Sequence, residues 1–137
     1  MASRSALLMV APSPARRWKV LLVDDTEDLR FIMRRVLHAN ASFEVAAEAE
    51  NGAEGVEQAR RTQPDVVLLD LLMPVMDGWE ALPRIKAAAP KAKIVVVSGQ
   101  DRNLMERRAL EQGAVAYIEK GTPPGEIVRR LARVMGE

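Results

Sequence analysis

Short apolar runs alternate along this chain with longer segments in which apolar residues return every three or four positions. Runs of four or five residues rich in Val, Leu and Ile are typical of strands buried on both faces, as in parallel sheets. The five strand-like segments occupy residues 19–23, 44–48, 66–69, 94–97 and 115–118. We therefore expect five strands, each followed by a helix.

The segments between these runs have the spacing of amphipathic helices. A second helix is expected over residues 52–61, and the last begins at Pro123 and Pro124, because proline is tolerated in a first helical turn. Short links between strand–helix units imply right-handed connections and a doubly wound parallel sheet covered on both faces. The apolar face of the first helix consists of Leu29, Ile32, Met33, Val36 and Leu37.

The third helix departs from this regular pattern. Its apolar residues begin at Trp79, yet Pro83 falls inside the segment. An interior proline destabilises a helix by ~3 kcal/mol or more. We expect either that the helix begins near Leu82 or that it bends there.

Three aspartates stand directly after two of the predicted strands. Asp24 and Asp25 follow the first strand, and Asp70 follows the third. In open α/β sheets, ligands bind outside the carboxyl ends of the strands, where the strand order reverses. If the two strands are neighbours, three carboxylates converge there, and at ~4 Å with an effective dielectric of ~20 each like-charged pair costs about 4 kcal/mol. Such a cluster indicates a site for a hard cation.

Composition limits the possible classes of protein. At 137 residues and 48% hydrophobic residues the chain fits one folded domain, and the absence of cysteine excludes disulfides and thiolate metal sites. Three of the 20 basic residues and none of the 19 acidic ones lie in residues 1–17, so the remainder carries a net charge of −2. We expect a basic, disordered leader at 1–17 and one domain at 18–137. No apolar run approaches the ~20 residues that span a bilayer.

Several segments, in order and at workable spacing, make the chain resemble a bacterial two-component response-regulator receiver domain over residues 18–135. The resemblance implies a flavodoxin-like fold: a five-stranded parallel sheet of order 2-1-3-4-5 with five helices on its two faces. The segments that carry it are Asp24-Asp25, Asp70 to Gly78, Ser98-Gly99, Ala109 to Ala114, Tyr117 and Lys120.

The resemblance also implies a role for each site residue. Asp70 is the phosphoacceptor nucleophile, and Lys120 and Ser98 contact the phosphoryl group. Mg²⁺, or Mn²⁺ in its place, is bound by Asp24, Asp25, Asp70 and the backbone carbonyl of Leu72, in keeping with the preference of Mg²⁺ for oxygen ligands. Ser98 and Tyr117 form the conformational switch.

By the same resemblance, the phosphoryl donor is a sensor histidine kinase or a phosphotransfer protein, and the location is cytoplasmic. The chain is not expected to be a turnover enzyme, although it catalyses its own phosphorylation and dephosphorylation. We expect no membrane contact and no direct contact with nucleic acid, and the output partner is unidentified. The surface that changes comprises the fourth helix, fifth strand and fifth helix, which carry Arg102, Arg107, Arg108, Arg129, Arg130 and Arg133.

One departure points to a subfamily. Gly121 follows Lys120, where most members of the family have proline, and Lys120-Gly121-Thr122 resembles the receivers of LuxR-like transcription regulators. The chain ends at Glu137, soon after the last helix. It is therefore interpreted either as a stand-alone receiver or as the input half of a longer DNA-binding regulator.

Other functions fit less well. A haloacid-dehalogenase-like phosphatase needs a second carboxylate two residues after its nucleophile as general acid, and that position is Leu72. A flavin-binding module needs a phosphate-binding loop after the first strand, where Asp24 and Asp25 would repel the phosphate. A pseudo-receiver that is never phosphorylated stays possible, although the complete acidic set argues against it. Leu72 also leads to the hypothesis that its bulk slows hydrolysis of the phosphorylated form.

Overall fold

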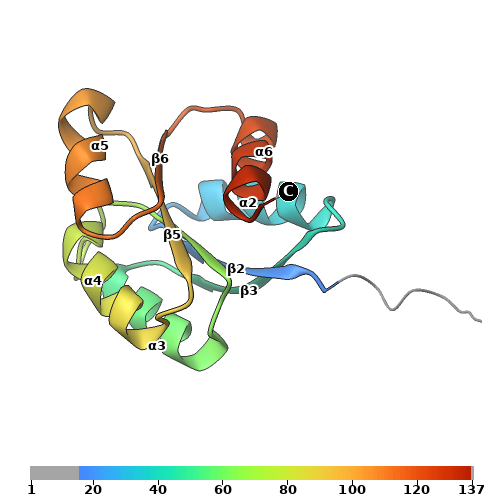
Figure 1. The fold of residues 1–137 in the computed structure, drawn as a ribbon, viewed down its shortest axis with the longest axis horizontal. Coiled ribbons are helices and arrows are strands. Elements are labelled where there is room, and N and C mark those ends of the chain that lie inside the picture. Colours follow the sequence, from blue (N-terminus) through green and yellow to red (C-terminus); the bar gives the residue numbers. More distant parts are fainter. Residues whose placement is uncertain (1–15, 137) are drawn as a thin grey trace, which may run out of the picture.

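The computed structural model describes residues 16–136, and all of the predicted leader except Arg16 and Arg17 lies outside the described residues. Strands and helices alternate along the described chain, and the labels are those of Figure 1. No helix in this part of the chain is long and apolar enough to cross a membrane. The elements are β2 Trp18–Val23, α2 Glu27–His38, β3 Phe43–Ala49, α3 Gly52–Thr62, β4 Val66–Leu69, α4 Gly78–Ala88, β5 Lys93–Ser98, α5 Arg102–Glu111, β6 Ala116–Glu119 and α6 Pro124–Val134.

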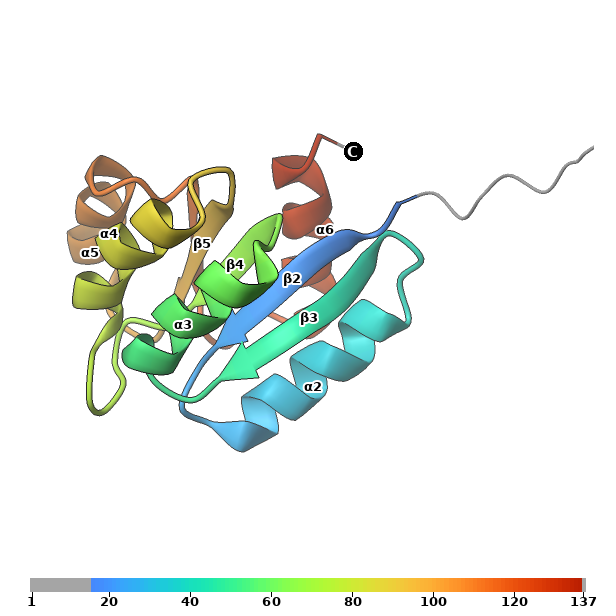
Figure 2. The same ribbon diagram turned by 90° about the horizontal axis from the view of Figure 1, so that it is seen from below.

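The strands form one parallel sheet in the order β3-β2-β4-β5-β6. Counted along the chain this is the order 2-1-3-4-5, so the predicted flavodoxin-like fold is confirmed. The strands run in the same direction, and the arrowheads of β2 and β3 lie at the same edge in Figure 2. Strand order reverses between β2 and β4, which are direct neighbours with Val23 opposite Leu69. The carboxyl ends of these two strands therefore meet.

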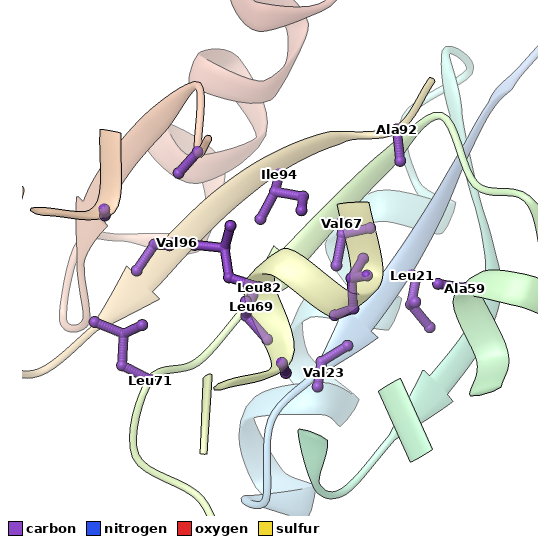
Figure 3. Close-up of a cluster of buried hydrophobic side chains, with 14 of the residues drawn as sticks. Leu21, Val23, Ala59, Val67, Leu69, Leu71, Leu82, Ala92, Ile94 and Val96 are labelled. Atoms are coloured by element: carbon purple, nitrogen blue, oxygen red, sulfur yellow. The ribbon is translucent and has the colours of Figure 1, made fainter. Parts of the chain in front are cut away.

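The helices cover the two faces of the sheet unequally. In Figure 1, α3, α4 and α5 lie on one side and α2 and α6 on the other. Alternate strand residues point to opposite faces, which divides the core into two clusters. The first cluster, drawn in Figure 3, packs residues such as Leu21, Leu69 and Val96 against Leu82 of α4. The second packs Val20, Leu68 and Val95 against α2 and α6.

The start of α4 corrects one of the two expectations for Pro83. The helix begins at Gly78 and continues through Pro83, so a start near Leu82 is wrong. Asp77 sets the start, because its carboxylate accepts a hydrogen bond from the Glu80 N–H at 2.9 Å, the usual geometry of a helix N-cap. Since Pro83 is exposed and lies in the second turn, the helix accommodates it with the loss of one backbone hydrogen bond.

The loop between Asp70 and α4 contains a strained residue. Val75 has φ of 69° and is 83% exposed. A β-branched residue in this left-handed region is a conformational outlier, because Cβ approaches the following carbonyl at a cost of roughly 1–2 kcal/mol. Glycine has no Cβ and adopts this conformation freely.

The Val75→Gly variant is therefore expected to be more stable than the wild type by about 1 kcal/mol, which raises the melting temperature by roughly 3–5 °C. Thermal denaturation followed by circular dichroism measures this. Val115→Gly is the matched control, because Val115 is also exposed but has no positive φ, and it should lose stability. A melting temperature for Val75→Gly at or below the wild-type value would refute the strain.

Candidate functional site

The reversal of strand order brings the three aspartates to one edge of the sheet. The backbone continues the ladder past the strands: the Asp70 N–H donates to the Val23 carbonyl at 2.9 Å, and the Asp24 N–H donates to the Ala49 carbonyl at 3.0 Å. One carboxylate oxygen from each of Asp24, Asp25 and Asp70 lies within 4.8 Å of the others. The structure therefore places together the three acids that the sequence singled out.

The three carboxylates differ in their exposure to solvent. Asp70 is 3% exposed, Asp24 is partly buried, and Asp25 is exposed. Asp24 is further held by a turn of its own loop, in which its carboxylate accepts a hydrogen bond from the Thr26 N–H at 2.8 Å. The cluster thus has a buried end at Asp70 and an open end at Asp25.

Lys120 brings a cation to the buried end. Lys120 follows β6, and its backbone N–H donates a hydrogen bond to the Ser98 carbonyl at 2.8 Å. Its Nζ lies 2.9 Å from Asp70 Oδ2 and 3.3 Å from Asp24 Oδ2. One ammonium thus faces two carboxylates, and it makes no ion pair with Asp25 in residues 16–136.

Burial and these charges shift two pKa values. Burial is the main cause that raises the pKa of Asp70 above its ordinary value; the hydrogen bond from Lys120 opposes this, and the charge of Asp24 adds to it. Burial also disfavours the Lys120 ammonium, but the hydrogen bond and charge of Asp70, together with Asp24, outweigh it and raise the pKa of Lys120. A further positive charge at this site would favour the ionised form of Asp70.

The donor atoms fit a hard divalent cation such as Mg²⁺. All three side chains offer carboxylate oxygens, which are the ligands that Mg²⁺ takes in proteins, commonly one or two of them with water and phosphate oxygens. Asp25 is open to solvent, which leaves room for coordinated water. The acidic excess over the one lysine also leaves negative charge for a cation to neutralise.

Ser98 is fully buried at the carboxyl end of β5, with Glu119 as its partner on β6. Its Oγ accepts a hydrogen bond from the Gln100 N–H at 3.1 Å. Within residues 16–136 no hydrogen bond joins Ser98 to the Asp70 carboxylate. The hydroxyl is therefore at the correct edge of the sheet and is held by the loop that follows β5.

Tyr117 lies inside the first core cluster and is 3% exposed. Its hydroxyl donates to the Gln100 carbonyl at 3.0 Å. The ring is therefore buried, and its hydroxyl is bonded to the protein. The backbone of Gln100 joins Ser98 to Tyr117, because its N–H donates to Ser98 Oγ and its carbonyl accepts from the Tyr117 hydroxyl. Nothing in the sequence identifies Gln100, since only its main chain takes part.

Gly78, the first residue of α4, packs directly against the backbone of Asp70 and Leu71. Its N–H donates to the Leu71 carbonyl at 2.9 Å, and a Cβ at this position would lie 2.2 Å from the Asp70 carbonyl oxygen. No side chain fits there, so glycine is required for α4 to begin directly against the Asp70 backbone. Sequence reasoning did not find this role, because it depends on how closely α4 packs against the loop.

Leu72 lies beside the Asp70 carboxylate and extends into solvent. Its side chain is 59% exposed, and its N–H points to Asp70 Oδ1 at 3.4 Å. A cavity of about 260 Å³ extends between α2 and the start of α6. Its lining is mostly apolar and includes Asp24, Asp70 and Lys120. Asp70 therefore forms part of the wall of this cavity although it is buried.

Comparison with known proteins identifies the class. The family model of the response regulator receiver domain matches residues 20–132. The chain is 37% identical over 116 residues to the chemotaxis protein CheY of Thermotoga maritima, covering 85% of this chain and 96% of that one. It is 36% identical to the transcription regulator BvgA of Bordetella pertussis, covering 85% of this chain and 56% of that one. The receiver domain of a putative NarL from Mycobacterium tuberculosis superposes with a TM-score of 0.81 at 30% identity, covering 88% of this chain and 98% of that one.

The chain therefore belongs to the response regulator receiver family, and it is a signalling module of the two-component type. Its relatives include both CheY proteins and the receivers of larger transcription regulators.

Proposed function

We propose that Asp70 accepts a phosphoryl group from a sensor histidine kinase or a phosphotransfer protein. The observation that carries this is the convergence of three carboxylates and Lys120 around a buried Asp70. Asp24, Asp25, Asp70 and the backbone carbonyl of Leu72 would hold Mg²⁺ or Mn²⁺. When bound, the metal supplies positive charge that offsets the negative charge of the phosphoryl group.

The transfer uses Asp70 as the nucleophile. An oxygen of the Asp70 carboxylate attacks phosphorus, a bond forms between that oxygen and phosphorus, and the bond from phosphorus to the donor breaks, with its electrons leaving on the donor nitrogen or oxygen. Lys120 already faces Asp70, so its ammonium can follow the phosphoryl oxygens without crossing the site. Ser98 supplies a hydroxyl donor at the same edge once it leaves Gln100.

The link through Gln100 supports a two-state switch. If Ser98 turns its hydroxyl to a phosphoryl oxygen, the loop after β5 moves with it, and the Gln100 carbonyl that holds Tyr117 moves too. A phosphoryl group favours one state only through better contacts in that state. We infer that the position of the Tyr117 ring reports the chemistry at Asp70.

The output surface on α5, β6 and α6 is less positive than its arginines suggest. Most of them form ion pairs within their own helix, for example Arg102 with Glu106 and Arg129 with Glu126. Arg108 instead stacks on Trp79 of α4, 3.9 Å from the ring centroid. Shape and apolar contact, for example at exposed Leu104, would therefore contribute more to recognition of an output partner than net charge.

A second candidate function is the receiver half of a DNA-binding regulator. The identity to BvgA, a transcription regulator of which this chain spans about half, and Gly121 after Lys120 both favour it. In either case the proposed reaction at Asp70 is the same, and the chain itself is not a turnover enzyme.

The test is the intact mass of the protein after incubation with acetyl phosphate, with and without Mg²⁺. We expect a single phosphoryl adduct that requires the metal. Chelation with EDTA should prevent its formation. If the protein stays unmodified in both samples, the experiment is repeated with a phosphorylated phosphotransfer protein as the donor. A protein that is unmodified there too would support a pseudo-receiver instead.

Leu72 is expected to slow loss of the phosphoryl group, because its N–H lies beside Asp70 Oδ1 and its exposed side chain adds bulk near the carboxylate that an attacking water must approach. In Leu72→Asn we expect hydrolysis about tenfold faster, equivalent to about 1.4 kcal/mol of barrier. Decay of the adduct, followed by intact mass after acetyl phosphate is removed, measures this. Leu104→Asn, an exposed leucine on α5, is the control and should decay at the wild-type rate. Equal decay in all three proteins would end the hypothesis.

A further inference from the structure

Arg30 of α2 holds the loop that carries Asp24 and Asp25. Its side chain is 11% exposed, and one guanidinium nitrogen donates to the backbone carbonyl of Asp24 at 2.6 Å. Its Nε donates to Glu48 Oε1 of β3 at 3.1 Å. The guanidinium therefore joins this loop to the neighbouring strand, and it contacts none of the three carboxylates.

The bond to the Asp24 carbonyl controls the direction of the next residue. That carbonyl belongs to the peptide plane between Asp24 and Asp25, and a peptide unit is planar and rigid. Fixing the direction of its C=O therefore fixes the orientation of the plane. The Cα of Asp25 lies in the same plane, so the starting direction of the Asp25 side chain is limited as well.

Asp25 needs this restraint more than its neighbours do. Asp70 is paired with Lys120, and Asp24 is bonded to Lys120 and to the Thr26 N–H. In residues 16–136 the Asp25 carboxylate has no hydrogen bond or ion pair, and it is exposed. Repulsion from two nearby carboxylates favours its turning away into solvent.

We propose that Arg30 is a positioning residue for the divalent cation: through the Asp24 carbonyl it keeps the Asp25 carboxylate directed at Asp70. This rests on the proposed function, since it concerns the same cation site. Arg30 would act as a hydrogen-bond partner outside the set of metal ligands, and it would orient a ligand without contacting the ion. Loss of such partners typically weakens metal binding 10–100-fold.

The test compares Arg30→Met with Arg34→Met. Arg34 lies one turn further along α2 and pairs with the same Glu48, but it makes no contact with the Asp24 carbonyl. Both variants remove one arginine partner of Glu48 and keep an apolar stem. Isothermal titration with MgCl₂ measures affinity, and the melting temperature in EDTA measures the stability of the metal-free protein.

We expect the Kd for Mg²⁺ to rise about tenfold in Arg30→Met and to stay at the wild-type value in Arg34→Met. The melting temperatures in EDTA should fall by similar small amounts in both. Arg30→Lys, which keeps one donor for the carbonyl, should recover part of the affinity. Equal affinity in Arg30→Met and Arg34→Met would overturn the role of Arg30.

A second variant covers the case in which Arg30→Met does not fold. Glu48→Gln weakens the anchor of Arg30 while leaving the donor in place, and it should raise the Kd about threefold, an order-of-magnitude expectation for a partial loss of the same restraint. Unchanged affinity in Glu48→Gln would contradict the proposal. Failure of the wild type to bind Mg²⁺ is a different result, because it would remove the proposed function together with this inference.

Discussion

Asp70→Asn is expected to take no phosphoryl group from acetyl phosphate, and to be more stable than the wild type in the absence of metal. The first result follows because the amide lacks the nucleophilic oxygen of a carboxylate. The second follows because the pKa of Asp70 is raised, which means that its ionised form is less favourable in the folded protein than in the unfolded chain. Intact mass measures the first result and thermal denaturation in EDTA the second.

The stability difference should depend on pH in a defined direction. A raised pKa means that the folded state retains the proton of Asp70 over a window that begins near the ordinary value of 3.8 and extends to the higher folded value. Wild-type stability relative to Asp70→Asn therefore falls as the pH rises through that window and stays low above it. Asp65→Asn, on a carboxylate outside the site, is the control for the loss of an acid. If the stability advantage of Asp70→Asn over the wild type shrank from pH 4 to pH 8, the result would contradict a raised pKa of Asp70.

Gly78→Ala is expected to destabilise the fold by about 3 kcal/mol or more, because the new Cβ would lie 2.2 Å from the Asp70 carbonyl oxygen and 2.7 Å from the Leu71 Cα. Both contacts are with backbone, so no side chain can rotate away. Either α4 moves outward or the loop after Asp70 moves. Urea denaturation measures the loss of stability, and weaker Mg²⁺ binding should accompany it.

Gly125→Ala is the matched control for Gly78→Ala. Both glycines are in the first turn of a helix, but a Cβ on Gly125 would meet only the Arg129 guanidinium at 3.8 Å. Alanine is the better helix former, so this variant should gain up to about 1 kcal/mol. If Gly78→Ala and Gly125→Ala changed the free energy of unfolding by the same small amount, α4 would not approach the Asp70 backbone as closely as described.

The sheet and the placement of the acids were predictable because they depend on patterns within short runs of adjacent residues. A buried parallel strand needs a run such as Val66 to Leu69, and the structure has β4 over the same residues. The carboxyl ends of adjacent strands then meet whatever the details of the loops. Capping by Asp77 is local in the same sense, because it uses a side chain and the turn that follows it.

The residues that sequence reasoning missed act through contacts between distant segments. Gln100 joins Ser98 to Tyr117 with its main chain, which any residue would offer. Arg30 has the spacing of an ordinary helix surface residue, and its bond to the Asp24 carbonyl depends on how α2 folds back on the loop. Pro83 led to a wrong prediction for the opposite reason: its low helix propensity suggested a late start, but the helix begins at Gly78 and continues through Pro83.

The division of the core by the sheet also limits where a change at Asp70 can be detected. The ring of Tyr117 packs on the side of α3, α4 and α5, whereas α6 is seated on the opposite side with Ile118 and Leu131. The sheet separates these compartments, so in the proposed switch a rotation of the ring would first change the packing beneath α5, on its own side of the sheet. A partner that contacts α5 and the adjoining margin of β6 would therefore detect the proposed rotation most directly.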